Sequence, residues 1–324
     1  MRRTRPWSPD LKPILTSEAH AERGLPPQGP REGQTFEGES LLVRYANLVK
    51  LPHTVFALPF ALIGVVYASA VDTVSVAKVV LVVLAFTAAR SCAMGFNRIV
   101  DRELDAKNPR TRGRELPSGK LSLQAAWAAV AVGAAVFVAS AGMLNRVCLS
   151  LSPVALLWIC GYSYTKRFTS WSHLWLGGAL AIAPVGGYLA VAGRWSDPAW
   201  TLVALAAAVA TWVAGFDVFY ALQDEAFDRE HGLRSAVARL GQARAILLAK
   251  LGHGLAIVLL FAFGVGAGLG LPYYLGVAAA SGLLVWEHQL VRPGDLSRLD
   301  AAFFTMNGLM SVVVFAGALA DRLL

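Results

Sequence analysis

The sequence predicts an all-α membrane protein, a bundle of about nine transmembrane helices with two aspartate-rich motifs at its cytoplasmic mouth. Three observations predict this class. Apolar residues make up 56% of the 324 residues and charged residues only 15%, against about 25% in an ordinary soluble domain. From residue 41 onward, long apolar runs follow one another. Two of these runs end in regularly spaced aspartates.

The first 40 residues differ from the rest of the chain. They contain six of the 15 prolines, and six basic residues balance six acidic ones. A segment of this composition buries too little apolar surface to fold on its own. We therefore predict a flexible tail over residues 1–40 and one membrane domain over residues 41–324.

The membrane domain is predicted to cross the lipid bilayer nine times. A helix needs about 20 apolar residues to cross the hydrocarbon core, and it satisfies its own backbone hydrogen bonds there. The strands of alternating polarity that a barrel requires do not occur in the sequence. The nine runs lie at about residues 53–71, 76–96, 122–143, 147–163, 173–192, 199–221, 246–268, 273–291 and 300–322.

Lysine and arginine in the loops predict the orientation in the membrane. The loops on the side of the aspartates carry 17 basic residues and the opposite loops carry 4. The positive-inside rule then places the aspartates and the N-terminus in the cytoplasm. The net charge of +8 is that of a membrane protein with basic loops, so no nucleic-acid partner is expected.

The second apolar run ends in a stripe of polar side chains. Asn97, Asp101 and Asp105 are spaced i, i+4 and i+8, which is one face of a continuing helix. A carboxylate inside a membrane costs about 2.5–3.5 kcal/mol on insertion scales, so its presence indicates a function. The alternative is a solvated helix end whose charges pair along the helix.

The sixth apolar run ends in a second stripe on the same side of the membrane. Asp217, Asp224 and Asp228 are spaced i, i+7 and i+11, with Tyr220 beside them. Oxygen ligands in this number suit Mg²⁺, which bridges carboxylates to phosphates. The matching pair of stripes therefore predicts a Mg²⁺–diphosphate site. The basic side chains available for the phosphates are those of Arg90, Arg110, Arg114, Lys166 and Arg167.

These motifs resemble those of the UbiA family of intramembrane prenyltransferases, which attach a polyprenyl chain to an acceptor. The family's first motif, N-D-x-x-D-x-x-x-D, reads NRIVDRELD from Asn97. Its second, D-x-x-Y-A-x-x-D-x-x-x-D, is matched at every fixed position from Asp217. RTRGRELPSG, from Arg110, is similar to the family's R-T-x-x-R-P-L-P-S-G. YSYTKR, from Tyr162, is similar to its Y-P-x-x-K-R.

The resemblance implies a role for each matching position. The residues implied to hold Mg²⁺, and through it the diphosphate, are Asn97, Asp101, Asp105, Asp224 and Asp228. The residues implied to bind substrate are Arg90, Arg110, Arg114, Tyr162, Lys166, Arg167 and Tyr220. Asp217 also matches a motif position and is expected to act in catalysis together with the other four aspartates.

Two further segments are similar to the UbiA-like bacterial branch, namely KLPHTVFALPFALIG and EHQLVRPGDLS. This likeness implies Mg²⁺-dependent transfer of a polyprenyl group from a polyprenyl diphosphate to the ring of an aromatic hydroxy acid. The acid implied is 4-hydroxybenzoate or 1,4-dihydroxy-6-naphthoate, for ubiquinone or menaquinone biosynthesis in a bacterial inner membrane. The prenyl chain length, the choice of acceptor and the oligomeric state stay open.

Arg98 stands where the family's first motif has an aspartate. It either contacts a phosphate oxygen, or it pairs with Asp101 or faces the lipid headgroups. We favour the second alternative, because adjacent residues of a helix do not share a face.

Two other classes of membrane protein are alternatives. A transporter also carries intramembrane acids, but they should lie near the middle of the bilayer, within reach of both sides. Here they lie at one end. A CDP-alcohol phosphotransferase also uses aspartates and Mg²⁺, but its D-G-x-x-A-R segment does not occur in this sequence.

Overall fold

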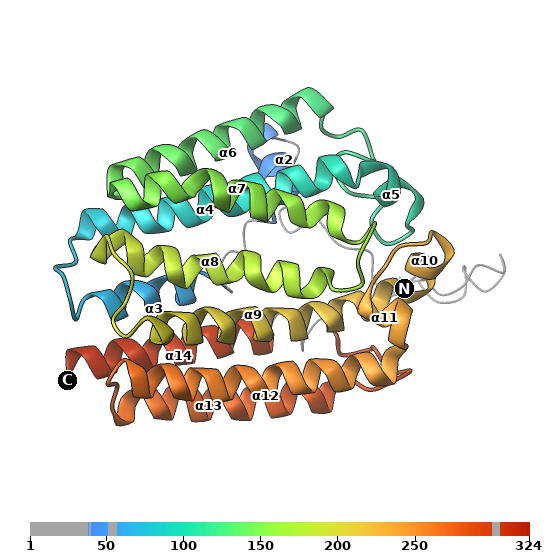
Figure 1. Ribbon diagram of the computed structural model, residues 1–324. Helices are drawn as coiled ribbons and strands as arrows, with labels where there is room; N and C mark the ends of the chain where they lie inside the picture. Colours follow the sequence, from blue (N-terminus) through green and yellow to red (C-terminus); the bar gives the residue numbers. More distant parts are fainter. Residues whose placement is uncertain (1–37, 39, 51–56, 300–304) are drawn as a thin grey trace, which may run out of the picture.

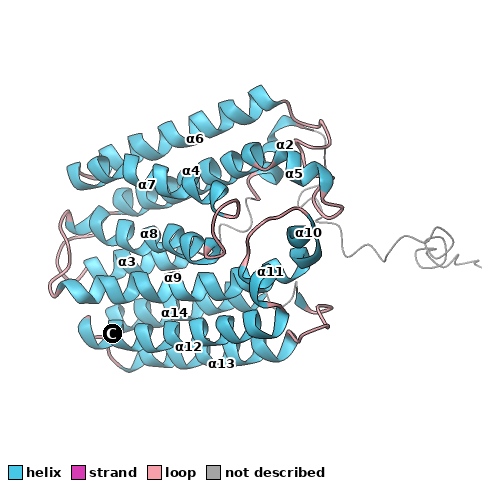
Figure 2. Ribbon diagram, turned by 45° about the vertical axis from the view of Figure 1, so that its right-hand side comes forward, coloured by secondary structure: helices cyan, strands magenta, loops and turns pink. Residues whose placement is uncertain are grey.

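The computed structural model describes residues 38, 40–50, 57–299 and 305–324. Helices joined by loops make up this part of the chain (Figures 1 and 2), which confirms the all-α class. The predicted tail over residues 1–40 lies almost entirely outside the described residues.

The elements follow one another along the chain in the order of their labels. They are α2 (Leu41–Leu48), α3 (Leu58–Ala68), α4 (Val76–Val100), α5 (Arg102–Lys107), α6 (Leu123–Leu144), α7 (Arg146–Thr165), α8 (Ser172–Ala192), α9 (Ala199–Ala221), the 3₁₀ turn η2 (Leu222–Asp224), α10 (Glu225–Glu230), α11 (Ala236–Leu240), α12 (Gln242–Gly266), α13 (Leu271–Leu290) and α14 (Asn307–Leu323).

Six helical segments are long and apolar enough to cross a membrane, as in an integral protein that crosses the bilayer several times. They are α4, α6, α7, α8, α9 with its continuation to Glu230, and α12. The three other expected runs coincide with α3, α13 and α14, which do not reach that combination of length and apolarity within the described residues. On the outer faces of α7 and α12, large apolar side chains such as Leu157 and Leu251 are exposed, as contact with lipid requires.

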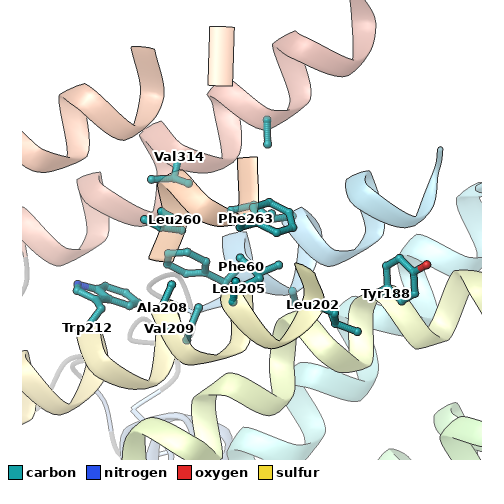
Figure 3. Close-up of a cluster of buried hydrophobic side chains, with 14 of the residues drawn as sticks. Phe60, Tyr188, Leu202, Leu205, Ala208, Val209, Trp212, Leu260, Phe263 and Val314 are labelled. Carbon is teal, nitrogen blue, oxygen red and sulfur yellow. The ribbon is translucent and has the colours of Figure 1, made fainter. Parts of the chain in front are cut away.

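The main apolar core lies between α3, α9, α12 and α14 (Figure 3). The Phe60 ring packs on the Trp212 ring at 5.0 Å between centroids. Leu260 and Val314 close the cluster from α12 and α14. Val82 on α4 and Tyr188 on α8 also belong to this cluster.

Glycines bring α8 into backbone contact with both of its neighbours. A side chain at Gly187 would collide with the carbonyl of Ala61 on α3, and one at Gly177 would collide with the carbonyl of Ala210 on α9. Small residues at helix crossings allow such close approach in membranes. Gly186 is different, because a Cβ there would meet no atom within 4 Å.

The short helices α5, α10 and α11 gather at one end of the bundle, on the right in Figure 1. Helix α5 follows α4, which carries the start of the first aspartate motif, and α10 and α11 follow α9, which carries the start of the second. The two motifs therefore share one end, as predicted, and the C-terminus lies at the opposite end.

We predict that Gly187→Val lowers the thermal unfolding midpoint of the protein in detergent. The new side chain must force α3 and α8 apart, and overpacking of this kind costs about 1–3 kcal/mol. Gly282→Val is the matched control, because Gly282 is also within a helix but has open space around it. Equal midpoints for the two variants would contradict the close packing of α8.

Candidate active site

A cavity of about 450 Å³ enters the bundle at the end that carries both motifs. All the predicted site residues except Asp228 line it. The lining continues from Asp101 down α4 to Val82, which is about 28 Å of helix at 1.5 Å per residue. Its inner part is lined mostly by apolar side chains of α4, α7 and α8. The cavity thus has a charged mouth and a long apolar arm.

The first motif departs from the continuous helix that its spacing suggests. Helix α4 ends at Val100, and α5 begins after Asp101. The i to i+4 backbone bonds nevertheless continue, since the amide of Asp101 donates to Asn97 O at 2.9 Å and that of Asp105 donates to Asp101 O at 2.8 Å. Asn97 Nδ2 also donates to Asp101 Oδ2 at 2.9 Å. Asn97, Asp101 and Asp105 therefore stay on one face despite the break, as predicted.

The second motif contains a similar break. Helix α9 ends at Ala221, and η2 joins it to α10. Asp217 and Asp224 line the cavity, whereas Asp228 is 2% exposed and stands outside its lining. Asp228 is thus the one aspartate of the two motifs that does not line the cavity. The 3₁₀ turn at η2 winds more tightly than an α-helix and changes the direction of the residues after it.

Arg110 joins the two motifs. It lies just after α5, and its Nε and Nη2 atoms donate to the two oxygens of Asp224 at 3.0 and 2.6 Å. Its Nη1 donates to the hydroxyl of Tyr220 at 2.9 Å. Asn108 Nδ2 donates to the same Asp224 Oδ1 at 3.1 Å. A two-pronged pair of this kind fixes both position and orientation.

Other guanidinium groups hold the carboxylates of the first motif. Arg114 Nη1 donates to Asp105 Oδ1 at 2.7 Å, and Arg167 Nη2 lies 3.4 Å from Asp101 Oδ1. Lys166 lines the cavity among the aspartates. Burial alone would lower its pKa, but Asp228, Asp217, Asp224 and Asp101 outweigh that effect and raise it.

The residues of the two motifs fit a hard cation. Two buried carboxylate oxygens, Asp105 Oδ2 and Asp228 Oδ2, have no hydrogen-bond partner, and one comes from each motif. Carboxylate oxygens are the donors that Mg²⁺ prefers. Within the described part of the chain, no three His, Cys, Asp or Glu side chains are yet close enough to hold one ion.

Arg98 faces the cavity, so the favoured expectation for it was wrong. It is 4% exposed, lines the cavity, and lies 4.0 Å from Asp105 Oδ2 rather than beside Asp101. Its Nε has no hydrogen-bond partner. The reason is the width of the cavity, which extends around α4 far enough to include both Asn97 and Arg98, about 100° apart.

Two further lining residues were not anticipated. Asn108 contacts Asp224 as described, and Lys50 Nζ lies 5.9 Å from the centre of the Tyr220 ring. No motif spacing marks Lys50, because it reaches the site from the loop after α2. Burial, followed by the charges of four cavity arginines, lowers the pKa of Lys50 to about 5. On the α4 side of the mouth, the positive charges around Lys50 therefore outweigh the negative ones.

The fold and site together define a class: a helical membrane protein whose charged cavity at one end combines two aspartate motifs with arginine and lysine. The chain belongs to the UbiA prenyltransferase family, which it matches over residues 57–309. This finding favours a prenyltransferase over a transporter or a CDP-alcohol phosphotransferase.

Individual relatives agree with the family. A 4-hydroxybenzoate octaprenyltransferase from Nitrosococcus oceani is 30% identical over 279 residues, which is 85% of this chain and 96% of the relative. The apo structure of a UbiA homolog from Aeropyrum pernix K1 is 33% identical, with a TM-score of 0.77 over 84% of this chain and 98% of that one. A UbiA homolog from Archaeoglobus fulgidus, solved bound to DMAPP and Mg²⁺, shares the fold at 18% identity, with a TM-score of 0.66 over 87% of this chain and 99% of that one.

We predict that binding of a diphosphate takes up a proton at Lys50. With a pKa of about 5 this amine is neutral at pH 7, and an anion placed among the cations raises its pKa, so the bound state holds more protons. Affinity should therefore fall as the pH rises through neutrality. Calorimetry in buffers of different ionisation enthalpy counts the protons, and Lys50→Met should take up fewer. Equal uptake by wild type and variant would contradict the prediction.

Proposed function

We propose that the protein transfers a polyprenyl group from a polyprenyl diphosphate to the ring of an aromatic hydroxy acid, in a reaction that depends on Mg²⁺. The acceptor is 4-hydroxybenzoate or 1,4-dihydroxy-6-naphthoate, in ubiquinone or menaquinone biosynthesis. The observation that carries the proposal is one cavity that combines residues of both aspartate motifs, a set of cations and an apolar arm. The name of the Nitrosococcus relative supports the aromatic acceptor.

The charged mouth would hold the diphosphate. The proposed Mg²⁺ ligands are Asn97, Asp101, Asp105, Asp224 and Asp228. The bound Mg²⁺ supplies positive charge that stabilises the leaving diphosphate. Substrate oxygens and rings are bound by Arg90, Arg110, Arg114, Tyr162, Lys166, Arg167 and Tyr220. Arg90 suits an anion well, because among the described residues no hydrogen bond or ion pair engages its guanidinium.

The apolar arm would hold the prenyl chain. When diphosphate leaves, the allylic carbocation must be kept from water, and an apolar wall does so. The arm is lined by side chains such as Phe86, Leu151 and Leu176. Gly186 also lines it and leaves space where a larger residue would intrude.

Asp217 is our candidate for the base that removes the ring proton. It lines the cavity, as Asp105 and Asp224 do. Those two carboxylates pair with arginines, whereas the side chain that contacts Asp217 within the described residues is a histidine, at 2.7 Å. Asp217 is therefore the carboxylate best placed to accept a proton from the acceptor ring.

The same proposal includes the arrangement in the membrane. Six apolar helices, together with α3, α13 and α14, correspond to the nine predicted crossings. The excess of basic residues at the end that carries the motifs supports a cytoplasmic site in a bacterial inner membrane.

A panel of acceptors tests the proposal directly. Purified protein is given a polyprenyl diphosphate, Mg²⁺ and a series of hydroxybenzoates and dihydroxynaphthoates, and products are analysed by mass spectrometry. We expect a ring-prenylated acid and one diphosphate per turnover, with the activity lost on chelation and restored by Mg²⁺. Failure to prenylate every acid, or full activity after exhaustive chelation, would overturn the proposal.

We predict that Asp101→Ala and Asp224→Ala each lower kcat by about a hundredfold or more, as loss of one electrostatic group at the transition state does. The double variant should lose little more, because either change already breaks the shared site. Steady-state kinetics measure the three values, and unchanged thermal midpoints control for folding. Losses that multiply would show that the two motifs act independently.

We predict that Gly186→Leu shortens the longest prenyl diphosphate that the protein accepts. The leucine side chain would enter the apolar arm, so KM should rise more steeply with chain length than in wild type. Gly282→Leu, on the exposed face of α13, is the control. An identical dependence on chain length in the Gly186 variant would show that the prenyl chain does not pass this residue.

A further inference from the structure

A buried histidine contacts the candidate base from outside the cavity lining. His173 is at the start of α8, is 3% exposed, and is separated from the solvent and from the cavity lining. Its Nδ1 lies 2.7 Å from Asp217 Oδ2 on α9. Its Nε2 lies 3.3 Å from the backbone nitrogen of Ala236, the first residue of α11. The ring thus links α8, on which it lies, to α9 and α11.

The second contact fixes which nitrogen carries the proton. A backbone N–H can only donate, so Nε2 of His173 must be the unprotonated, accepting nitrogen. Nδ1 therefore carries the hydrogen and donates it to Asp217 Oδ2. Because the amide of Ala236 belongs to the first turn of α11, it has no acceptor within its own helix, and the imidazole satisfies it.

We propose that His173 is a positioning residue. Its hydrogen bond holds one oxygen of Asp217 in place and so directs the other oxygen at the acceptor ring. The proposal rests on the function proposed above. Lys166, which lines the cavity and is attracted to Asp217, is the competing partner. A carboxylate released from His173 can turn toward that ammonium group and away from the acceptor ring. The hydroxyl of Tyr162 is a further titratable group near Asp217, and Asp228 lies near the ring of His173.

His173 supports the removal of the ring proton that follows prenyl transfer. The bond between the prenyl carbon and the diphosphate oxygen breaks, and its electron pair leaves with the diphosphate. The ring carbon next to the hydroxyl forms a bond to the prenyl carbon. The proton on that ring carbon passes to Oδ1 of Asp217, and the electron pair of the C–H bond restores the aromatic ring. Asp217 then loses the proton to water.

Two substitutions separate positioning from mere packing. His173→Gln keeps a donor for Asp217 and an acceptor for Ala236, whereas His173→Leu keeps neither. We expect His173→Leu to lower kcat at least about tenfold, since a well-placed base contributes more than that, and to leave KM for the prenyl diphosphate within about twofold. Acceptor deuterated on the ring should then show a primary isotope effect on kcat that wild type lacks, because proton removal has become slow. His173→Gln should restore most of kcat and remove the isotope effect.

The outcomes distinguish this proposal from the proposed function. If wild type prenylates the acid and His173→Leu matches it in kcat and isotope effect, His173 does not position the base. Loss of kcat without an isotope effect, or equal loss in the glutamine variant, would assign a structural role instead. If wild type prenylates no acid, the proposed function fails, and this proposal fails with it.

A measurement on the unaltered protein covers the case in which the leucine variant does not fold. ¹⁵N NMR of histidine-labelled protein, with the His173 signal assigned from the glutamine variant, reports the tautomer. We expect a neutral ring protonated at Nδ1. A ring protonated at Nε2 would contradict the proposal.

Discussion

Burial of opposite charges at one end of an apolar helix bundle is the constraint on which the rest of the structure depends. A carboxylate taken out of water is tolerated only beside compensating charge and hydrogen bonds. Asp224 obtains both from Arg110 and Asn108, which lie on the loop after α5. That loop must therefore fold against the end of α9. The same pair brings the two aspartate motifs, far apart in the sequence, to one cavity.

The charges are not evenly matched across the mouth, and this imbalance favours a ligand that carries both positive and negative charge. Lys166 is surrounded by aspartates, whereas Lys50 is surrounded by arginines. A metal-bound diphosphate is a ligand of this kind. Its metal ion can bind the aspartates, and its anionic oxygens can bind the arginines. Below the mouth the lining becomes apolar, so a ligand with a charged head and a long hydrocarbon chain fits the whole cavity.

The sequence predicted what depends on local periodicity. Membrane helices satisfy their own hydrogen bonds, so apolar runs mark them, and aspartates spaced at i+4 and i+7 stay on one face even through the breaks at Asp101 and Leu222. The position of Arg98 depends instead on how far the cavity extends around α4, and the role of His173 depends on an amide of α11. Neither leaves a pattern along the chain. The roles of two glycines cannot be predicted from the sequence either. Only the packing of α8 shows that Gly187 lies in a helix contact and Gly186 at the cavity.

The central claim is that both motifs hold one metal-bound diphosphate. Electron paramagnetic resonance with Mn²⁺ in place of Mg²⁺, and with an unreactive polyprenyl thiolodiphosphate, measures it directly. Wild type should show hyperfine coupling between Mn²⁺ and ³¹P in a protein-bound complex, and this coupling should disappear in both Asp101→Ala and Asp224→Ala. Coupling that survives in either variant at the wild-type strength would mean that one motif alone holds the metal and its diphosphate, and would contradict the account.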